Sequence, residues 1–306
     1  MLKRGISCFL ITGLRHYTAL PDNYHYTQRL ESGVTLRIGL PQWHHAHWKR
    51  WGIETLADYA RYFGTVEGNT TLYALPDTET VLRWRDMTHD QFRFCFKFPS
   101  SISHQAALQN TDDLVTDFFR LMTPLADRIG QYWLQLPASF SPAQLNDLWR
   151  FLDSLPGHFS YGVEVRHAAF FAKGEAERAL NRGLLQRGVN RVVLDSRPVH
   201  ASTSQSPAAL HARQQKPRVP PHALLTGSRP IIRFVGSDNL EESLPLFKIW
   251  LAKLTEWHAQ CEPLVFIHTP DMGQVFPLVQ ALWPELQKID ASIGPGPDWP
   301  QQDSLF

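Results

Sequence analysis

Six charged side chains stand inside short apolar runs, where a chain normally places hydrophobic residues. Three are carboxylates and three are cations: Glu67, Glu164 and Asp195, and Lys97, Arg166 and Arg233. Removing a charge from water is costly, so buried charges persist when they are paired or when they bind a ligand. Carboxylates among cations can move protons on a negatively charged substrate. We predict acid–base chemistry, with Lys97 as polarising cation or base, Glu164 as proton shuttle, and Asp195 and Glu67 completing the catalytic set.

The runs that carry these residues predict eight β-strands. They span residues 37–43, 66–73, 92–99, 131–137, 161–167, 191–196, 231–237 and 264–269. Amphipathic stretches separate most of them, and eight strands alternating with helices in about 250 residues are typical of an α/β protein with a single (β/α)8 TIM-type barrel. The pattern lacks one helix. Residues 199–230 are rich in Ser, Pro, Gln and basic residues, which predicts an irregular long loop in place of the helix after the sixth strand.

Alternation along each strand predicts which side chains point inward. Phe92, Phe94, Phe96 and Phe98 share one face of the third strand and need the helix layer, so Lys97 points into the barrel. The same reasoning places the other five charged residues inside the barrel. In the sixth strand, for example, Val192 and Leu194 are predicted to face outward, so Asp195 faces inward. Barrel sites lie at the C-terminal ends of the strands. The ligand-binding residues predicted there are Asn69, Tyr73, His104, Gln135, Arg166, His167, Arg233 and His268, and Arg213, Lys216 and Arg218 on the long loop extend the cationic set.

Composition narrows the class of protein. The formal net charge of the 306 residues is +1, so no overall field favours nucleic acid or an acidic membrane. No run approaches the roughly 18 apolar residues of a membrane span. The three cysteines (Cys8, Cys95 and Cys261) form no Cys-x-x-Cys pair, which is typical of reduced thiols in a cytosolic protein. We expect a cytoplasmic protein whose partner is a small anionic ligand, with no direct nucleic acid binding.

Several segments together resemble a known family. Residues 66–76 (Val-Glu-Gly-Asn-Thr-Thr-Leu-Tyr-Ala-Leu-Pro), 94–99, 103–104, 135–137 and 163–167 (Val-Glu-Val-Arg-His) are similar to the successive motifs of the domain of unknown function 72 family, in its YecE-like branch. The resemblance covers essentially residue 36 to the C-terminus. It implies a TIM-barrel fold and no established activity. Residues 233–236 read Arg-Phe-Val-Gly where many members carry Arg-x-His-Gly.

Other chemistries remain as alternatives. A retaining glycosidase needs one protonated carboxyl of a pair about 5 Å apart, but neighbouring cations would hold Glu67 and Glu164 ionised. A divalent-metal-dependent isomerase or phosphoesterase would use Glu164, His167, Asp195 and His268, although Lys97 and Arg166 would repel the ion. We therefore predict no metal and no cofactor. A purely structural ion-pair network and a non-catalytic binding or recruitment module are the remaining alternatives.

The two ends of the chain do not follow the strand–helix pattern. We expect residues 1–34 to be a non-core extension, from a spurious start or disordered, residues 35–290 to form the barrel, and residues 291–306 to be a Pro/Gly-rich tail. The tail ends in residues that resemble the short peptides by which bacterial proteins dock on the replication sliding clamp: Gln301, Leu305 and Phe306. A sliding-clamp contact is therefore a second candidate partner interaction.

Overall fold

The computed structural model describes residues 35–296. Each of the eight predicted runs overlaps a strand, and the sixth overlaps two. The strands are β1 (Arg37–Gly39), β2 (Thr65–Gly68), β3 (Arg93–Lys97), β4 (Ile129–Gln135), β5 (Tyr161–Glu164), β6 (Asn190–Arg191), β7 (Val193–Asp195), β8 (Ile231–Val235) and β9 (Leu264–His268). The predicted extension 1–34 and the clamp-binding residues Gln301, Leu305 and Phe306 lie outside the described residues, so both stay predictions.

The strands form two parallel sheets, with orders β1-β9-β8-β7 and β2-β3-β4-β5-β6. The fold is therefore α/β with parallel strands, as predicted, but a single closed barrel is not shown. The two sheets approach each other at both junctions. Only Val192 separates β6 from β7, and its N–H donates to the carbonyl of Val163 at 2.9 Å. On the other side, the N–H of Glu67 donates to the carbonyl of Leu40 at 3.0 Å.

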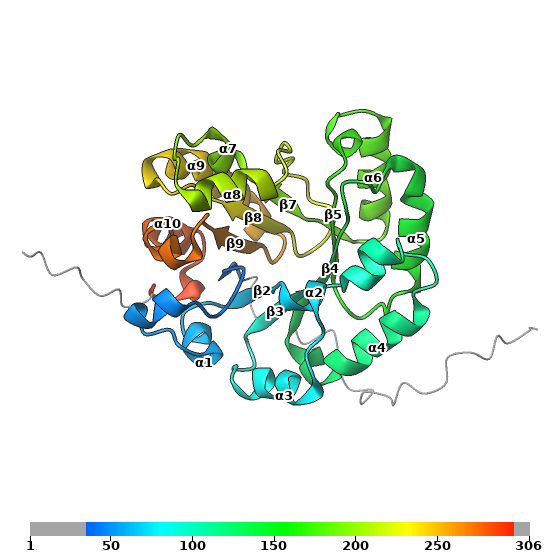
Figure 1. Cartoon of the computed structure of the whole chain (residues 1–306), viewed down its shortest axis with the longest axis horizontal. Helices are drawn as coiled ribbons and strands as arrows, with labels where there is room; N and C mark the ends of the chain where they lie inside the picture. Colours follow the sequence, from blue (N-terminus) through cyan, green and yellow to red (C-terminus); the bar gives the residue numbers. More distant parts are fainter. Residues whose placement is uncertain (1–34, 297–306) are drawn as a thin grey trace, which may run out of the picture. The chain divides into compact units, whose positions relative to one another are not determined.

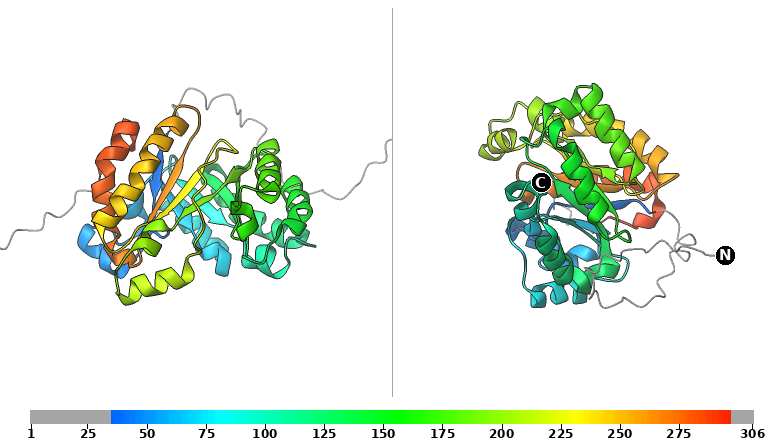
Figure 2. Two further views of the ribbon diagram at one scale, coloured as in Figure 1. Left: turned by 90° about the horizontal axis from the view of Figure 1, so that it is seen from above. Right: turned by 90° about the vertical axis from the view of Figure 1, so that its right-hand side faces the viewer.

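Helices surround these strands (Figure 1). The α-helices are α1 (Leu56–Ala60), α2 (Thr70–Tyr73), α3 (Thr78–Asp86), α4 (Asp112–Met122), α5 (Leu145–Ser154), α6 (Glu175–Gln186), α7 (Arg197–Ala201), α8 (Pro207–Gln215), α9 (Leu240–His258) and α10 (Val275–Ile289). Figure 2 shows α9 and α10 side by side, and the two helices pack against each other. None of the helices in the described part of the chain is long and apolar enough to cross a membrane.

Short helical turns complete the connections. They are η2 (Ala46–Trp51), η3 (Ser101–Gln105), η4 (Thr123–Arg128), η5 (Pro142–Gln144), η6 (Ala168–Phe171), η7 (Met272–Gln274) and η8 (Ala291–Ile293). Two of them, η3 and η6, directly follow strands that carry charged site residues. The segments after β3 and β5 therefore leave the sheet as short helical turns, a π-helical turn at η3 and a 3-10 turn at η6.

The prediction of an irregular long loop after the sixth strand is wrong for its first half. Helices α7 and α8 lie there, and only residues 202–206 and 216–230 contain neither helix nor strand. Ser206 caps α8, because its side chain accepts a hydrogen bond from the N–H of Ala209 at 3.1 Å, and Pro207 follows as the first helical residue. The buried face of α8 consists of Ala209 and Ala212. Two alanines give too weak an apolar stripe to predict a helix.

The alternation predicted for the strands holds except in the sixth run. The phenylalanines of the third run pack in the outer core, while Cys95 and Trp133 belong to a separate inner cluster with Ile231, Leu264 and Phe266. Val192 lies in that inner cluster and Val193 in the outer core. Val192 was predicted to face outward, and this is wrong. Three consecutive apolar residues, 192–194, have no period-two pattern from which a face can be assigned.

Candidate functional site

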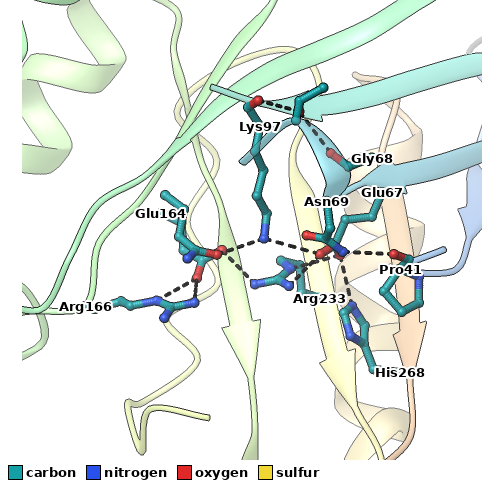
Figure 3. Close-up of polar contacts among 11 residues, drawn as sticks. Pro41, Glu67, Gly68, Asn69, Lys97, Glu164, Arg166, Arg233 and His268 are labelled. Atoms are coloured by element: carbon teal, nitrogen blue, oxygen red, sulfur yellow. Dashed lines mark hydrogen bonds and ion pairs between the residues drawn. The ribbon is translucent and has the colours of Figure 1, made fainter. Parts of the chain in front are cut away.

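Arg233 is the centre of a buried group of charges at the C-terminal ends of the strands (Figure 3). Its side chain leaves β8 and binds two carboxylates at once. Nη2 and Nε donate to the two carboxylate oxygens of Glu67 at 2.6 and 3.0 Å, and Nη1 donates to Glu164 at 2.8 Å. Burial alone would lower the pKa of Arg233, but the two carboxylates raise it above its ordinary value. The guanidinium is therefore a fixed positive charge.

Glu67 is fully buried and is the carboxylate with the most partners. Besides Arg233, it accepts a hydrogen bond from Nε2 of His268 at 3.0 Å, and Nζ of Lys97 lies 3.5 Å away. Burial alone would raise the pKa of Glu67, but the surrounding positive charge, Arg233 above all, holds that pKa well below 4.5. The next residue, Gly68, leaves room for the Phe96 ring, since a Cβ there would lie 2.2 Å from it.

Glu164, the last residue of β5, joins Arg233 to Arg166. Its second carboxylate oxygen accepts from Nε and Nη2 of Arg166 at 3.1 and 3.0 Å. Burial would raise the pKa of Glu164, but Arg233 and then Arg166 lower it to about 2. Glu164 is therefore ionised at neutral pH, as the sequence predicted. The Arg166 side chain remains 24% exposed, so one face of this cation is open to solvent.

Lys97 is buried like Arg233 but makes fewer polar contacts. These contacts are too few to hold a permanent positive charge. Its side chain is 3% exposed, and Nζ donates to the amide oxygen of Gln135 at 2.8 Å. The ammonium lies 5.3 Å from the centre of the Trp133 ring. Burial, followed by the charge of Arg233, lowers the pKa of Lys97 from 10.5 to about 7. The amine can therefore exchange a proton near neutral pH.

His268 ends β9 inside the cluster, as predicted. Burial lowers its pKa to about 4, although Glu67 opposes this shift. The ring is therefore neutral at pH 7. Because an ionised carboxylate can only accept, the contact with Glu67 places the imidazole proton on Nε2 and leaves Nδ1 as an acceptor.

Lys216 brings a further positive charge from the irregular part of the long connection. Burial and then the charge of Arg233 lower the pKa of Lys216, and Glu67 and Glu164 also act on it. Its two predicted basic neighbours do not join: Arg213 donates to the carbonyl of Ser204, and Arg218 is exposed. Lys216 thus joins the cationic set as expected. Its nearness to the two glutamates depends on the path of residues 216–230, and no sequence pattern predicts that path.

Three of the remaining predicted ligand-binding residues lie beside the cluster. Gln135 contacts Lys97 directly. Burial, and then the charges of Arg166 and Lys97, lower the pKa of His104, whose Nδ1 lies 2.8 Å from Oγ of Ser103. Asn69 is half-buried, and its amide donates to the carbonyl of Pro41 at 2.9 Å (Figure 3).

Asp195, Tyr73 and His167 do not join the cluster. Asp195 was predicted to face inward, but it contacts the helix layer. It accepts from Nε1 of Trp250 on α9 at 2.8 Å and from Nη2 of Arg197 at 2.7 Å. The prediction is wrong for the same reason as for Val192, because the apolar run before Asp195 does not reveal its face. Tyr73 is 80% exposed. Nδ1 of His167 accepts from the N–H of Ala169 at 3.2 Å and caps η6.

These positions also bear on the metal-dependent alternative. It required Glu164, His167, Asp195 and His268 to converge, but Asp195 is bound by Arg197 and Trp250. Among residues 35–296, no group of three or more His, Cys, Asp and Glu side chains is arranged to hold a metal ion. The donor set of that hypothesis is therefore not assembled.

The fold and the site define a parallel α/β protein with a buried charge cluster at the strand ends. The chain belongs to the family described as "Protein of unknown function DUF72", whose model matches residues 37–302. This confirms the family suggested by the sequence motifs. It is 62% identical over 269 residues to the UPF0759 protein YecE of Escherichia coli K12, covering 88% of this chain and 99% of that protein. The same protein of Escherichia coli O157:H7 is 61% identical over 269 residues, with the same coverage.

Solved structures of two more distant relatives share the fold. A DUF72 family protein from Enterococcus faecalis V583 aligns with a TM-score of 0.63 at 18% identity, over 83% of this chain and 95% of that one. A DUF72 family protein from Thermotoga maritima MSB8 aligns with a TM-score of 0.62 at 18% identity, over 83% and 99% of the two chains. Identity this low supports the common fold and says nothing of activity.

Proposed function

We propose that this protein is a cytosolic enzyme that uses acid–base chemistry on an anionic, sugar-like metabolite carrying a phosphate or a carboxylate. The observation that carries the proposal is the charge balance of the cluster. Even when Lys97 is neutral, three cations (Arg166, Lys216 and Arg233) interact with only two carboxylates, Glu67 and Glu164. An anionic ligand would supply the missing negative charge.

The cations are not equivalent in this balance. Arg233 makes three hydrogen bonds to the two carboxylates and has little left to offer a ligand. Arg166 shares Glu164 with Arg233 and keeps an exposed face. Within residues 35–296 the Lys216 ammonium makes no hydrogen bond or ion pair. Arg166 and Lys216 are therefore the groups best suited to bind the phosphate or carboxylate of the ligand.

The low pKa values of the two glutamates restrict their roles. Both are ionised at neutral pH, so each can accept a proton but does not hold one to donate. This argues against a retaining glycosidase, which needs a protonated carboxyl. Lys97, with a pKa of about 7, is the group that can gain and lose a proton in this range. We assign Lys97 as the base and Glu164 as the carboxylate that receives and relays the proton.

We also propose that the two sheets belong to one closed barrel of the predicted TIM type. The backbone hydrogen bonds at Val192 and Glu67, which link the sheets at both junctions, support this. In that arrangement the charged residues all point into the barrel from its C-terminal end, which is where TIM-barrel enzymes carry out their chemistry.

Thermal melting tests the anion site. Purified protein would be melted with sugar phosphates, with sugar acids and with the matching neutral sugars, in the wild type and in Lys216→Gln. A ligand at about 100 times its Kd stabilises by about 2.7 kcal/mol. We expect an anionic sugar to raise the Tm of the wild type, its neutral counterpart not to, and Lys216→Gln to lose most of the shift.

The control variant is Lys288→Gln, since Lys288 is exposed and pairs with Glu285 far along α10. Its response should equal that of the wild type. If no anionic sugar shifts the wild type more than Lys216→Gln or Lys97→Ala, the anion site is refuted. The remaining candidate would then be the non-catalytic recruitment module that the tail motif suggests.

A further inference from the structure

We propose that Lys97 is a nucleophile that forms a Schiff base with an aldehyde or ketone group of the ligand. This inference rests on the proposed anion site and specifies its substrate class: a carbonyl compound that also carries a phosphate or a carboxylate. Lys97 then bonds to the substrate carbon as well as exchanging protons with it.

The hydrogen bonding of Nζ does not require an ammonium ion. An ammonium has three N–H donors, while a neutral amine has two and a lone pair. Nζ has one acceptor at hydrogen-bond distance, Oε1 of Gln135 at 2.8 Å, and a second, Oε1 of Glu67, at 3.5 Å. Only the Gln135 oxygen therefore requires an N–H group, and a neutral amine can satisfy it. The lone pair then remains available for attack on a carbonyl carbon.

Arg233 removes the need for Lys97 as a counter-ion. The guanidinium satisfies Glu67 with two hydrogen bonds and Glu164 with one, and Arg166 satisfies the other oxygen of Glu164. A buried lysine placed only to neutralise these carboxylates would be redundant. The pKa of about 7, caused by burial and by Arg233, agrees with this and leaves about half of the amine neutral at pH 7.

A second observation is an unpaired buried donor on the residue that packs against the amine. Trp133 is fully buried, its ring lies under Nζ of Lys97, and its indole N–H has no hydrogen-bond partner among the described residues. Native proteins rarely leave a buried donor unpaired, so such a group calls for an explanation. A carbonyl or hydroxyl oxygen of a bound substrate can accept this hydrogen bond.

The proposed step balances without a further reactant. The lone pair of Lys97 forms the N–C bond as the carbonyl π bond opens onto oxygen. The two amine hydrogens move to that oxygen, which leaves as water, and a C=N bond replaces C=O. The ionised carboxylate of Glu67, 3.5 Å from Nζ, can accept a proton from nitrogen and pass it to the leaving oxygen. Protonation of the imine from solvent gives an electron-withdrawing iminium beside the carbon that reacts next.

Reductive trapping tests the step. The full-length protein would be incubated at pH 7 with dihydroxyacetone phosphate, with glyceraldehyde 3-phosphate and with pyruvate, each with sodium cyanoborohydride, and analysed by intact mass and peptide mapping. We expect one secondary-amine adduct per chain for at least one probe, located at Lys97. Lys97→Arg keeps the charge and should give no such adduct. Lys49→Arg, a change at an exposed lysine, should label as the wild type does.

A small neutral carbonyl tests the amine without any variant or anion site. In reductive methylation with limiting formaldehyde at pH 7, Lys97 should react at least about 10-fold faster than Lys49. The reactive form is the neutral amine, which an ordinary lysine adopts in only about one molecule in a few thousand at this pH, whereas the pKa of Lys97 is about 7. Labelling at Lys97 no faster than at Lys49, or no adduct at Lys97 with any of the three anionic probes, overturns the proposal. If 2-phosphoglycolate, which has no aldehyde or ketone group, still raises the Tm in the absence of adducts, the anion site stands and only the Schiff base fails.

Discussion

Replacing Arg233 should destabilise the folded protein far more than replacing Lys97, although both are buried cations of the same cluster. The change Arg233→Met keeps most of the side-chain volume and removes the charge. It deletes the three hydrogen bonds that join β8 to Glu67 on β2 and Glu164 on β5. Both carboxylates are fully buried or nearly so, so water cannot replace the lost donors without a rearrangement.

The size of the effect follows from the partners that remain. Glu67 would keep His268 and the more distant Lys97, and Glu164 would keep Arg166. Removing one partner of a buried ion pair typically costs 3–5 kcal/mol. Since two carboxylates lose their main partner together and each retains another, we expect Arg233→Met to lower the free energy of unfolding by about 3–5 kcal/mol. This is a large part of the 5–15 kcal/mol typical of a domain.

Lys97→Met should cost little. It deletes one hydrogen bond to Gln135, worth about 1 kcal/mol, and it also removes the cost of burying an amine whose pKa is lowered to about 7. Between pH 7 and 10.5 the unfolded chain holds a proton on Lys97 that the folded chain does not. The stability of the wild type should therefore rise with pH in this range relative to Lys97→Met.

Urea unfolding followed by circular dichroism at pH 7 and pH 9 measures both variants beside the wild type. Arg83→Met is the matched control, because Arg83 pairs with Glu79 on the exposed face of α3 and such surface pairs contribute about 0–1 kcal/mol. The reasoning is refuted if Arg233→Met costs no more than Arg83→Met, or if Lys97→Met costs as much as Arg233→Met. The second result would make Lys97 a structural member of the network.

Two further outcomes are expected. The pKa of Glu164 is about 2 in the folded protein and 4.5 ordinarily, a difference that corresponds to about 3 kcal/mol of stability present above pH 4.5 and lost as the pH falls through 2. The difference in unfolding free energy between the wild type and Glu164→Gln should therefore become smaller from pH 5 to pH 2.5. A difference that stays constant over this range would contradict the prediction. A peptide of residues 297–306 should bind a purified bacterial sliding clamp in a polarisation assay, whereas the peptide with Leu305→Ala and Phe306→Ala should not; equal signals from both would reject the clamp contact.

The sequence predicted site residues well wherever a strand has a clear alternation. Four phenylalanines at every second position of the third run left only one face for Lys97, and Val163 and Val165 did the same for Glu164. It failed in the sixth run, where consecutive apolar residues gave Asp195 no defined face. There the strand is interrupted at Val192, and the carboxylate turns to Trp250 on α9.

Some features depend on tertiary structure that no local pattern encodes. The buried face of α8 is made of alanines, so its hydrophobic pattern was too weak to indicate a helix. Lys216 reaches the charge cluster through an irregular segment whose path is set by packing. The link from Arg233 to two other strands, whose carboxylates lie 166 and 69 positions away in the chain, could be inferred only as nearness at the strand ends. Its bonding pattern required coordinates.

That bonding pattern divides the cluster into two kinds of charge. Arg233, Glu67 and Glu164 satisfy one another with short hydrogen bonds, and a structural network accounts for them fully. Lys97 and Lys216 do not fit such a network, because burial and the charge of Arg233 work against their charges and Glu67 and Glu164 offset only part of this cost. A protein that needed only the network would lose little stability by replacing these two lysines with apolar residues. Their presence at the strand ends is therefore the strongest argument in this structure for a ligand that binds there.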